Sequence, residues 1–547
     1  MDSDAAPPPP KGTSDDDHWP PTAEQLDAAK KSFISAIDPD AVCRLASRHH
    51  PTARPCRVFS ETASGSFNAC FFVEFDDAQH TKWNVRVAIM PALDDAWAKV
   101  QSEVATMRYI RQKTTIPVAR VHAYGRGEDL CRPDAPTPNA AHSCVYAVFD
   151  YLPGHSIDIS ALFSDTRERK THLYAQIIDI LAQLRGLEFP VSGSLYPPSS
   201  SSPSSSSEPT IGNLLCIEHN ELRKMTRWRS THRSGIFRTP AEYALYQYRT
   251  MSAAYQVPID RCAEIWAQME EYALHDVKAR VVDWILDTTS GDGADAGGEC
   301  FVLSHTDLRW YNILVDDHLN VQGVIDWERS GTVPQRLFMP PNWLAGQSPS
   351  SVGSQTYRKA YAEFYAVLTS MVDELAAAAA QADQDQQDAS SALPPNVYQK
   401  LADEWGADLP DRPVLPLAAI LRHHHHLVQS YFFCIFRKSM QLPYVLPRDF
   451  LPEFFVLDKK NGGPLSRAVE QRLDRTKRYQ QYLQDNGLFV ERRLPPAVLE
   501  WLKKRAKMHA DNLEEYRRKK DPFYEPLCEL TAESVFQDSM QMWNYAE

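Results

Sequence analysis

The stretch FVLSHTDLRWYNILVDDHLNVQGVIDWE, residues 301–328, decides the fold because it places an ordered set of polar residues between apolar segments. The segments FVLS, NILV and GVID each have the length and composition of a short buried strand. His305, Asp307 and Asn312 follow the first segment with the spacing H-x-D-x-x-x-x-N, and Asp326 comes fourteen residues after Asn312. This order predicts a strand, a polar loop and two further strands that bring two carboxylates and an amide together.

The residue types in this loop suit phosphoryl transfer. That reaction needs a carboxylate that accepts or orients the acceptor hydroxyl, and oxygen ligands for magnesium on the triphosphate. We therefore predict Asp307 as the catalytic base, Asn312 and Asp326 as magnesium ligands, and His305 as a brace for the loop, with ATP and Mg²⁺ as cofactors. Taken singly, each residue is equally typical of a turn, but the ordered set favours a catalytic site.

With these residues in place, the segment resembles the aminoglycoside phosphotransferase and choline kinase branch of the protein-kinase-like superfamily, especially its large fungal set. The likeness is strongest in GVIDWERSGTVPQRLF, residues 323–338, where Asp326 and Trp327 stand in place of the DFG of a protein kinase. The resemblance implies an α+β bilobal protein-kinase-like fold, with a small antiparallel-sheet N-lobe and a larger, mainly helical C-lobe. It implies ATP-dependent transfer to a small-molecule hydroxyl, and the lack of an APE-like segment counts against a protein kinase.

The resemblance also assigns a phosphate loop to ETASGSFN, residues 61–68. Ser64, Gly65 and Ser66 would let backbone amides approach the β- and γ-phosphates. By itself, one glycine between serines is as typical of a plain hairpin.

The hinge between the lobes is assigned to VYAVFDYLPG, residues 145–154. Phe149 would face the adenine, and the Asp150 carbonyl and the Leu152 amide would bind its edge. A plain core strand is the alternative, and the Pro-Gly pair that ends the segment favours the hinge.

Arg86, in WNVRVAIM, occupies the place where kinases usually carry a lysine that binds the α- and β-phosphates. Arginine keeps the charge but presents a fork instead of a point, so its reach differs. Glu103 on the following helix would be its partner, or else an ordinary acid on a helix surface. The replacement leaves open a pseudokinase, a nucleotide-binding protein with little turnover.

Composition and pattern predict four regions. They are a disordered tail at 1–22, an N-lobe at 23–152, a C-lobe at 153–490 with a disordered insertion at about 197–210 and a loop at about 381–394, and a C-terminal helical extension at 491–547. Strands are expected within 54–65, 67–77, 80–90, 116–125 and 144–152. Helices are expected at 22–37, 95–113, 165–187, 240–256, 258–287, 355–382, 465–485 and 497–520.

Charge and cysteine usage limit the class of partner. The net charge of −13 disfavours nucleic acid and anionic membranes and is compatible with a cationic small acceptor. The ten cysteines form no CxxC pair, no eighteen-residue apolar stretch occurs, and the start is acidic and proline-rich, so we expect reduced thiols in a cytoplasmic protein. The pattern specifies no oligomeric state.

Two further features have a functional and a plain interpretation. The run His423–His426 invites a metal site, but four consecutive histidines on a helix would point in different directions. Glu328, beside the expected magnesium ligand, could contact a cationic acceptor or simply end a strand.

Overall fold

The computed structural model of the chain describes residues 19–132, 143–198, 208–225, 234–290, 300–346, 348–385, 396–441 and 447–490, together with residues 500 and 504. These residues form two compact units, one of residues 20–254 and 277–435, the other of Trp19, 255–276 and the described residues from 436 onward. The predicted helix at 497–520, nearly all of the tail and the C-terminal extension, and most of the insertion at 197–210 lie outside the described residues.

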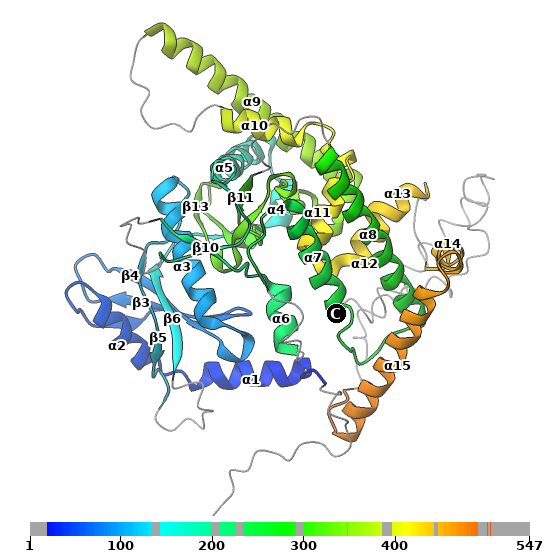
Figure 1. Cartoon of the computed structure of the whole chain (residues 1–547). Helices are drawn as coiled ribbons and strands as arrows, with labels where there is room; N and C mark the ends of the chain where they lie inside the picture. The colour runs from blue at the N-terminus through cyan, green and yellow to red at the C-terminus, as the bar shows by residue number, and fades with distance from the viewer. Residues whose placement is uncertain are drawn as a thin grey trace, which may run out of the picture. The chain divides into compact units, whose positions relative to one another are not determined.

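The N-lobe of the larger unit is built on an antiparallel sheet in the order β1-β3-β4-β6-β5, with the short β2 paired to β3 (Figure 1). Its strands are β1(Cys56–Val58), β2(Ala63–Ser64), β3(Asn68–Phe75), β4(Lys82–Ala88), β5(Val121–Glu128) and β6(Cys144–Asp150). The five longer strands form the small antiparallel sheet that the sequence predicted. They are rich in β-branched and aromatic residues, which favour a pleated surface.

Helices cover both faces of this sheet. On one face, alternate residues of β3, from Ala69 to Phe75, join a core with residues of α1(Ala23–Ala36) and α2(Pro39–His49). On the other face, α3(Ala96–Lys113) packs on β5 and β6. Thr22 caps α1 in a capping box with Gln25, and the helix lies within the predicted range 22–37, whereas α2 was not predicted although Asp38 caps it.

The C-lobe is mainly helical and carries three small antiparallel sheets. Its helices are α4(Ile159–Ser164), α5(Arg167–Arg185), α6(Ile217–Met225), α7(Pro240–Ala254), the end of α8(Glu264–Ser290), α9(Gln355–Asp385), α10(Asn396–Trp405), α11(Val414–Arg422) and α12(Leu427–Tyr431). The sheets are β14(Gly331–Pro334)-β11(Phe301–Ser304)-β8(Glu188–Phe189), β13(Val321–Val324)-β12(Ile313–Val315)-β7(His155–Ser156) and β10(Thr210–Gly212)-β9(Ser194–Tyr196). The α+β bilobal kinase-like fold is therefore confirmed.

Some boundaries differ from those expected. The loop predicted at 381–394 is wrong for its first residues, because α9 continues to Asp385 through an alanine-rich stretch of high helix propensity. The long helix expected from residue 258 begins only at Glu264. Pro258, Asp260 and Arg261 precede it and do not continue the apolar spacing of the helix. The strands predicted at FVLS and NILV form as β11 and β12, whereas β13 begins two residues before the predicted GVID and ends at Val324.

The second unit combines residues 255–276, which include the start of α8, with α13(Arg437–Ser439), α14(Pro447–Lys460) and α15(Pro464–Asp485). Arg472 of α15 pairs with Glu270 of α8, with 2.5 Å between Nε and Oε2, and both side chains are buried. The Trp19 ring packs at 5.4 Å from the ring of Tyr479. This buried ion pair and aromatic contact join segments that are far apart in the sequence.

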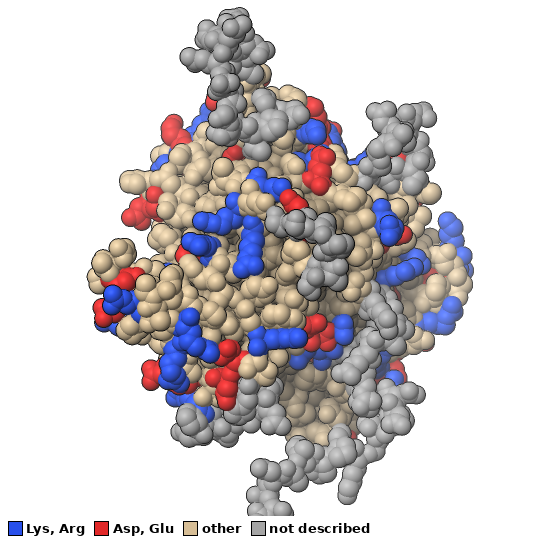
Figure 2. All heavy atoms as spheres, turned by 60° about the vertical axis from the view of Figure 1, so that its left-hand side comes forward, with Lys and Arg blue, Asp and Glu red and all other residues tan. Residues whose placement is uncertain are grey.

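On the face drawn in Figure 2, lysine and arginine side chains are interspersed with acidic ones and with wide neutral areas. Among the described helices, none combines the length and the apolar character needed to cross a bilayer. No disulfide bond joins the cysteines of the described ranges.

Candidate active site

The predicted catalytic loop is fixed to the segment that carries Asp326. His305 follows β11, is buried, and donates from Nε2 to the Ile325 carbonyl at 2.8 Å. The Ile325 amide donates in turn to the Asn312 carbonyl at 3.0 Å. Burial lowers the pKa of His305, which keeps the ring neutral with the proton on the donating nitrogen. His305 therefore lies where a brace between the two segments would lie.

Asp307 and Asn312 lie together at the mouth of this loop. The Asn312 side chain donates from Nδ2 to the Asp307 carbonyl at 2.8 Å, which leaves its Oδ1 as the group able to bind a cation. Tyr311 donates its hydroxyl to Asp307 Oδ2 at 3.3 Å. Arg309 pairs with the other carboxylate oxygen, with 2.8 Å between Nε and Oδ1. These contacts hold the Asp307 side chain in one orientation.

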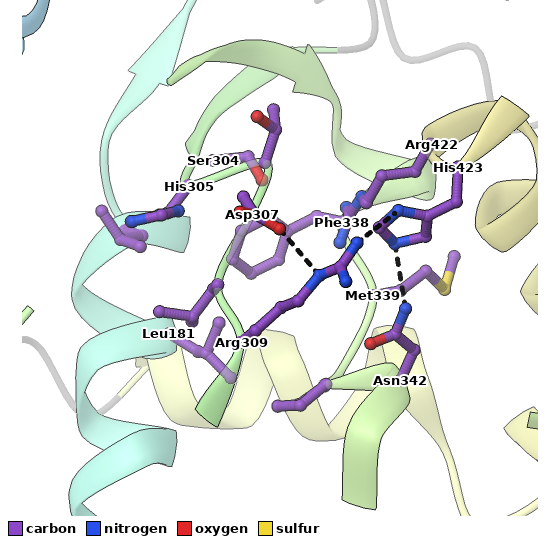
Figure 3. A pocket seen from close by; sticks show the side chains of 14 residues that line it. Leu181, Ser304, His305, Asp307, Arg309, Phe338, Met339, Asn342, Arg422 and His423 are labelled. Atoms are coloured by element: carbon purple, nitrogen blue, oxygen red, sulfur yellow. Dashed lines mark hydrogen bonds and ion pairs between the residues drawn. The ribbon is translucent and has the colours of Figure 1, made fainter. Parts of the chain in front are cut away.

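His423 and Asn342 hold Arg309 in turn, and the dashed lines in Figure 3 follow this row of contacts from Asp307 to Asn342. His423 lies 3.4 Å from Arg309 through Nδ1 and 2.9 Å from the Asn342 side chain through Nε2. Burial, with Arg309 and Arg422 nearby, holds the pKa of His423 far below its usual value, so a neutral ring can accept from Arg309. No pattern in the sequence indicates this contact, because 114 positions separate Arg309 from His423.

The histidine run supplies this contact and no metal cluster. Within the part of the chain that the structure describes, no group of three or more His, Cys, Asp or Glu side chains could hold a metal ion by itself. Residues His424–His426 form a 3-10 turn after α11, where the sequence interpretation assumed a continuous helix.

Arg86 joins the two lobes. From β4 it pairs through Nη1 with Glu103 at 2.6 Å and through Nη2 with Asp326 at 2.8 Å. The expected pair of Arg86 and Glu103 is present, and the fork of arginine lets one side chain reach two carboxylates. Asp326 has a left-handed backbone, with φ 64° and ψ 49°, a strained conformation that is commonest at functional sites.

Lys99 was missed by the sequence reasoning. It lies one helical turn before Glu103 on α3, is 2% exposed, and pairs with Glu328. Asn68 donates to the same Glu328 oxygen at 2.6 Å and accepts from Lys99. Burial acts to raise the pKa of Glu328, but Lys99 and Arg86 outweigh it and lower the pKa to about 2. Glu328 is therefore ionised and already paired, which argues against the interpretation in which it contacts a cationic acceptor.

Two adjoining cavities meet at Asp326. The first, about 350 Å³, contains every residue predicted for the nucleotide except Ser64, which lies in β2 beside it: Gly65, Ser66, Arg86, Glu103, Phe149, Asp150 and Leu152 line it together with Asp326. The second, about 640 Å³, is lined by Asp307, Arg309 and Tyr311 and by residues of α1 and α6. Gly65, Ser66 and Asp326 line both, so the phosphate loop lies where the cavities join.

The phosphate loop itself is a tight hairpin. The Gly65 amide donates to the Asn68 carbonyl at 3.0 Å, so this amide is already used within the turn. The plain hairpin reading of the single glycine therefore holds for the local structure. The expectation that the Gly65 amide points at a phosphate is therefore not met. Ser66, which lines both cavities, is the neighbouring residue that can approach a ligand.

The family model described as the phosphotransferase enzyme family matches residues 60–334, about half of the chain, from the phosphate loop to the end of β14. The chain belongs to this phosphotransferase family. The sequence-based recognition is therefore confirmed.

One curated relative comes from the fungus Ampulloclitocybe clavipes. It is the clavilactone A biosynthesis cluster protein Y, 23% identical over 329 residues that cover 59% of this chain and 70% of the relative. Among solved structures, an ethanolamine kinase of Plasmodium vivax matches at 11% identity and a TM-score of 0.32, over 70% of this chain and 79% of that one. A macrolide 2'-phosphotransferase type I matches at 12% identity and a TM-score of 0.32, over 78% and 100%.

Proposed function

We propose that this phosphotransferase transfers the γ-phosphate of ATP, with magnesium, to a hydroxyl group of a small molecule in the cytoplasm. The observation that carries this proposal is that Asp326 lines both cavities while Asp307, to which Asn312 is hydrogen-bonded, lines the second. The nucleotide would occupy the cavity beneath the sheet, and the acceptor the cavity beside Asp307. Transfer would take place where the cavities join.

The chain's donors fit the cofactor. Asn312 offers an amide oxygen and Asp326 a carboxylate, and magnesium is usually bound by one or two such groups together with substrate phosphates. A bound magnesium would neutralise charge on the transferring phosphoryl group. Arg86 would release Asp326 as that carboxylate turns to the metal, and would keep its contact with Glu103 while its free edge meets a phosphate.

The acceptor side depends on Asp307. Its carboxylate would orient the hydroxyl and take its proton as the new oxygen–phosphorus bond forms and the bond to the β-phosphate oxygen breaks. Arg309 and Tyr311 would hold that carboxylate in place, and the cavity walls would hold the rest of the acceptor.

The test is a panel of metabolites and antibiotics incubated with enzyme and MgATP, read by mass spectrometry as an ATP-dependent gain of one phosphate. We expect Asp307→Asn to reduce the rate on any acceptor found by about 10²–10⁴-fold, the usual contribution of a general base. Asp326→Asn should abolish transfer by removing a metal ligand. Asp317→Asn, in the turn between β12 and β13 with a side chain 96% exposed, is the matched control and should behave as the wild type.

Equal residual turnover in Asp307→Asn and the wild type would contradict the enzyme proposal. Nucleotide binding without turnover would favour the pseudokinase, for which Arg86 and the single glycine of the phosphate loop are the specific observations. Phosphate found on added proteins in place of small molecules would favour a protein kinase.

A further inference from the structure

The second cavity contains charged residues that the proposed chemistry does not use. Lys30 comes from α1, Glu221 and Lys224 from α6, and Arg329 from the 3-10 turn after Asp326. The other charged residues of this cavity are paired within the chain: Asp307 with Arg309, Asp326 with Arg86, and Glu328 with both Arg86 and Lys99. The charges that a ligand meets in this cavity therefore come mainly from the first set, Lys30, Glu221, Lys224 and Arg329.

Arg329 is the most informative member of that set. It is only 6% exposed, and Nη1 donates to the Cys216 carbonyl at 3.0 Å. Nε and Nη2 are buried and have no hydrogen-bond partner among the described residues. The guanidinium lies 4.5 Å from the centre of the Phe67 ring, which holds its plane but accepts no N–H bond in that plane. Buried donors on a charged group are rarely left unused.

The chemistry of this edge selects its ligand. Nε and Nη2 form the side of the guanidinium that binds two oxygens of a carboxylate or phosphate in parallel. Burial lowers the pKa of Lys224, and a nearby anion would offset that loss. Burial raises the pKa of Glu221, while the charges of Arg329 and Lys30 act to lower it. Burial raises the pKa of the neighbouring Glu218 to about 7, so this carboxyl compensates Arg329 only in part near neutral pH.

We infer that the acceptor carries an oxyanion, a carboxylate or phosphate, which binds the Nε–Nη2 edge of Arg329 with Lys30 and Lys224 nearby, while its hydroxyl reaches Asp307. This inference rests on the proposed function and differs from the cationic acceptor with which the net charge is compatible. The nucleotide is a less suitable source of the anion, because none of Arg329, Lys30 and Lys224 lines the nucleotide cavity.

The test measures binding, so it does not depend on turnover. Ligand-observed NMR on the full chain with saturating MgADP would compare glycerate, inorganic phosphate and 2-amino-1,3-propanediol, which is a cationic alcohol of similar size. We expect both oxyanions to bind the wild type better than the aminodiol. Arg329→Gln should weaken glycerate binding about tenfold or more, as loss of a charge-assisted bidentate contact does.

The matched control is Arg57→Gln, an arginine on β1 with a side chain 80% exposed, which should bind glycerate as the wild type does. If Arg329→Gln does not fold, the test uses Lys30→Gln and Lys224→Gln instead. Each of these variants should weaken glycerate binding severalfold. Unchanged glycerate binding in these variants, tighter binding of the aminodiol, or no binding of either oxyanion would overturn the inference.

A separate titration with MgATP distinguishes the two sources of phosphate. The inference expects Arg329→Gln to bind MgATP within about twofold of the wild type, while glycerate binding is lost. A large loss of MgATP affinity with glycerate unaffected would assign Arg329 to the nucleotide and overturn the inference. Failure of phosphotransfer in the acceptor panel would leave these binding results intact, so the two proposals fail separately.

Discussion

At the scale of single residues, Arg86 shows why a lysine and an arginine are not equivalent at this position. Its two terminal nitrogens reach different carboxylates, Glu103 on α3 and Asp326 after β13. A lysine has a single nitrogen on a flexible stem and can satisfy one such direction well. The guanidinium is therefore the group that connects the helix of one lobe to the strained aspartate of the other.

We predict that Arg86→Lys lowers the free energy of unfolding by about 1–3 kcal/mol, and that Arg86→Met lowers it by about 3–5 kcal/mol, because Glu103 is then buried without its partner. Urea unfolding without nucleotide measures both. Arg57→Lys, exposed on β1, is the control and should change stability little. If Arg86→Lys were as stable as the wild type, a single nitrogen at this position would be enough to hold Glu103 and Asp326, and the prediction would be wrong.

At the scale of elements, the short 3-10 turn after α11 is stabilised by a buried neutral histidine. His424 is 1% exposed and donates from Nε2 to the Leu421 carbonyl at 3.0 Å. Burial lowers its pKa from 6.5 to about 4. Because the folded pKa lies below the unfolded value, the unfolded chain binds more protons between these values, and stability falls as the pH drops through this window.

We predict that the wild type loses about 2 kcal/mol more stability than His424→Gln between pH 7 and pH 5, since glutamine can donate to Leu421 without titrating. The measurement is urea unfolding at both pH values. His318→Gln, an exposed histidine in the turn before β13, is the control and should follow the wild type. Parallel pH profiles for His424→Gln and the wild type would show that the buried ring does not set this dependence.

At the scale of the larger unit, a buried polar cluster connects the two lobes. Lys99 on α3 and Asn68 on β3 both contact Glu328, although Asn68 and Glu328 are 260 residues apart. Lys99 and Glu103 also approach at 3.7 Å, so the cluster is continuous with Arg86 and Asp326. The relative position of the phosphate loop and the catalytic loop therefore depends on this cluster.

We predict that Lys99→Met destabilises the fold by about 3–5 kcal/mol because it leaves the Glu328 carboxylate buried with one cation fewer. The double variant Lys99→Met with Glu328→Gln should be less destabilised than the sum of the two single changes, with a coupling of about 1–3 kcal/mol. Urea unfolding of all four proteins gives the cycle. The exposed pair of Arg478 and Asp474 on α15 is the control cycle and should be nearly additive. Additive changes at Lys99 and Glu328 would contradict the buried pair.

Much of the fold could be predicted because its signals are local. The five sheet strands, the capped α1 and α3, and the strands around the catalytic loop follow from period, capping and composition within short windows. The helices α2 and α6 were missed, since each is short and takes its place from packing more than from its own pattern. The resemblance to a known family supplied the order of the lobes and the grouping of the nucleotide residues.

The sequence by itself determined the family, the bilobal fold and the loop with Asp307 and Asn312, because each is encoded by residues near one another along the chain. Only the tertiary structure showed that Lys99 pairs with Glu328 and that His423 contacts Arg309. It also showed that two buried donors of Arg329 have no partner among the described residues. Each of these depends on a contact between distant segments, and on burial that removes water from a charge. Spacing in a sequence specifies neither of these, so partners of buried charged groups appear only when the lobes are assembled.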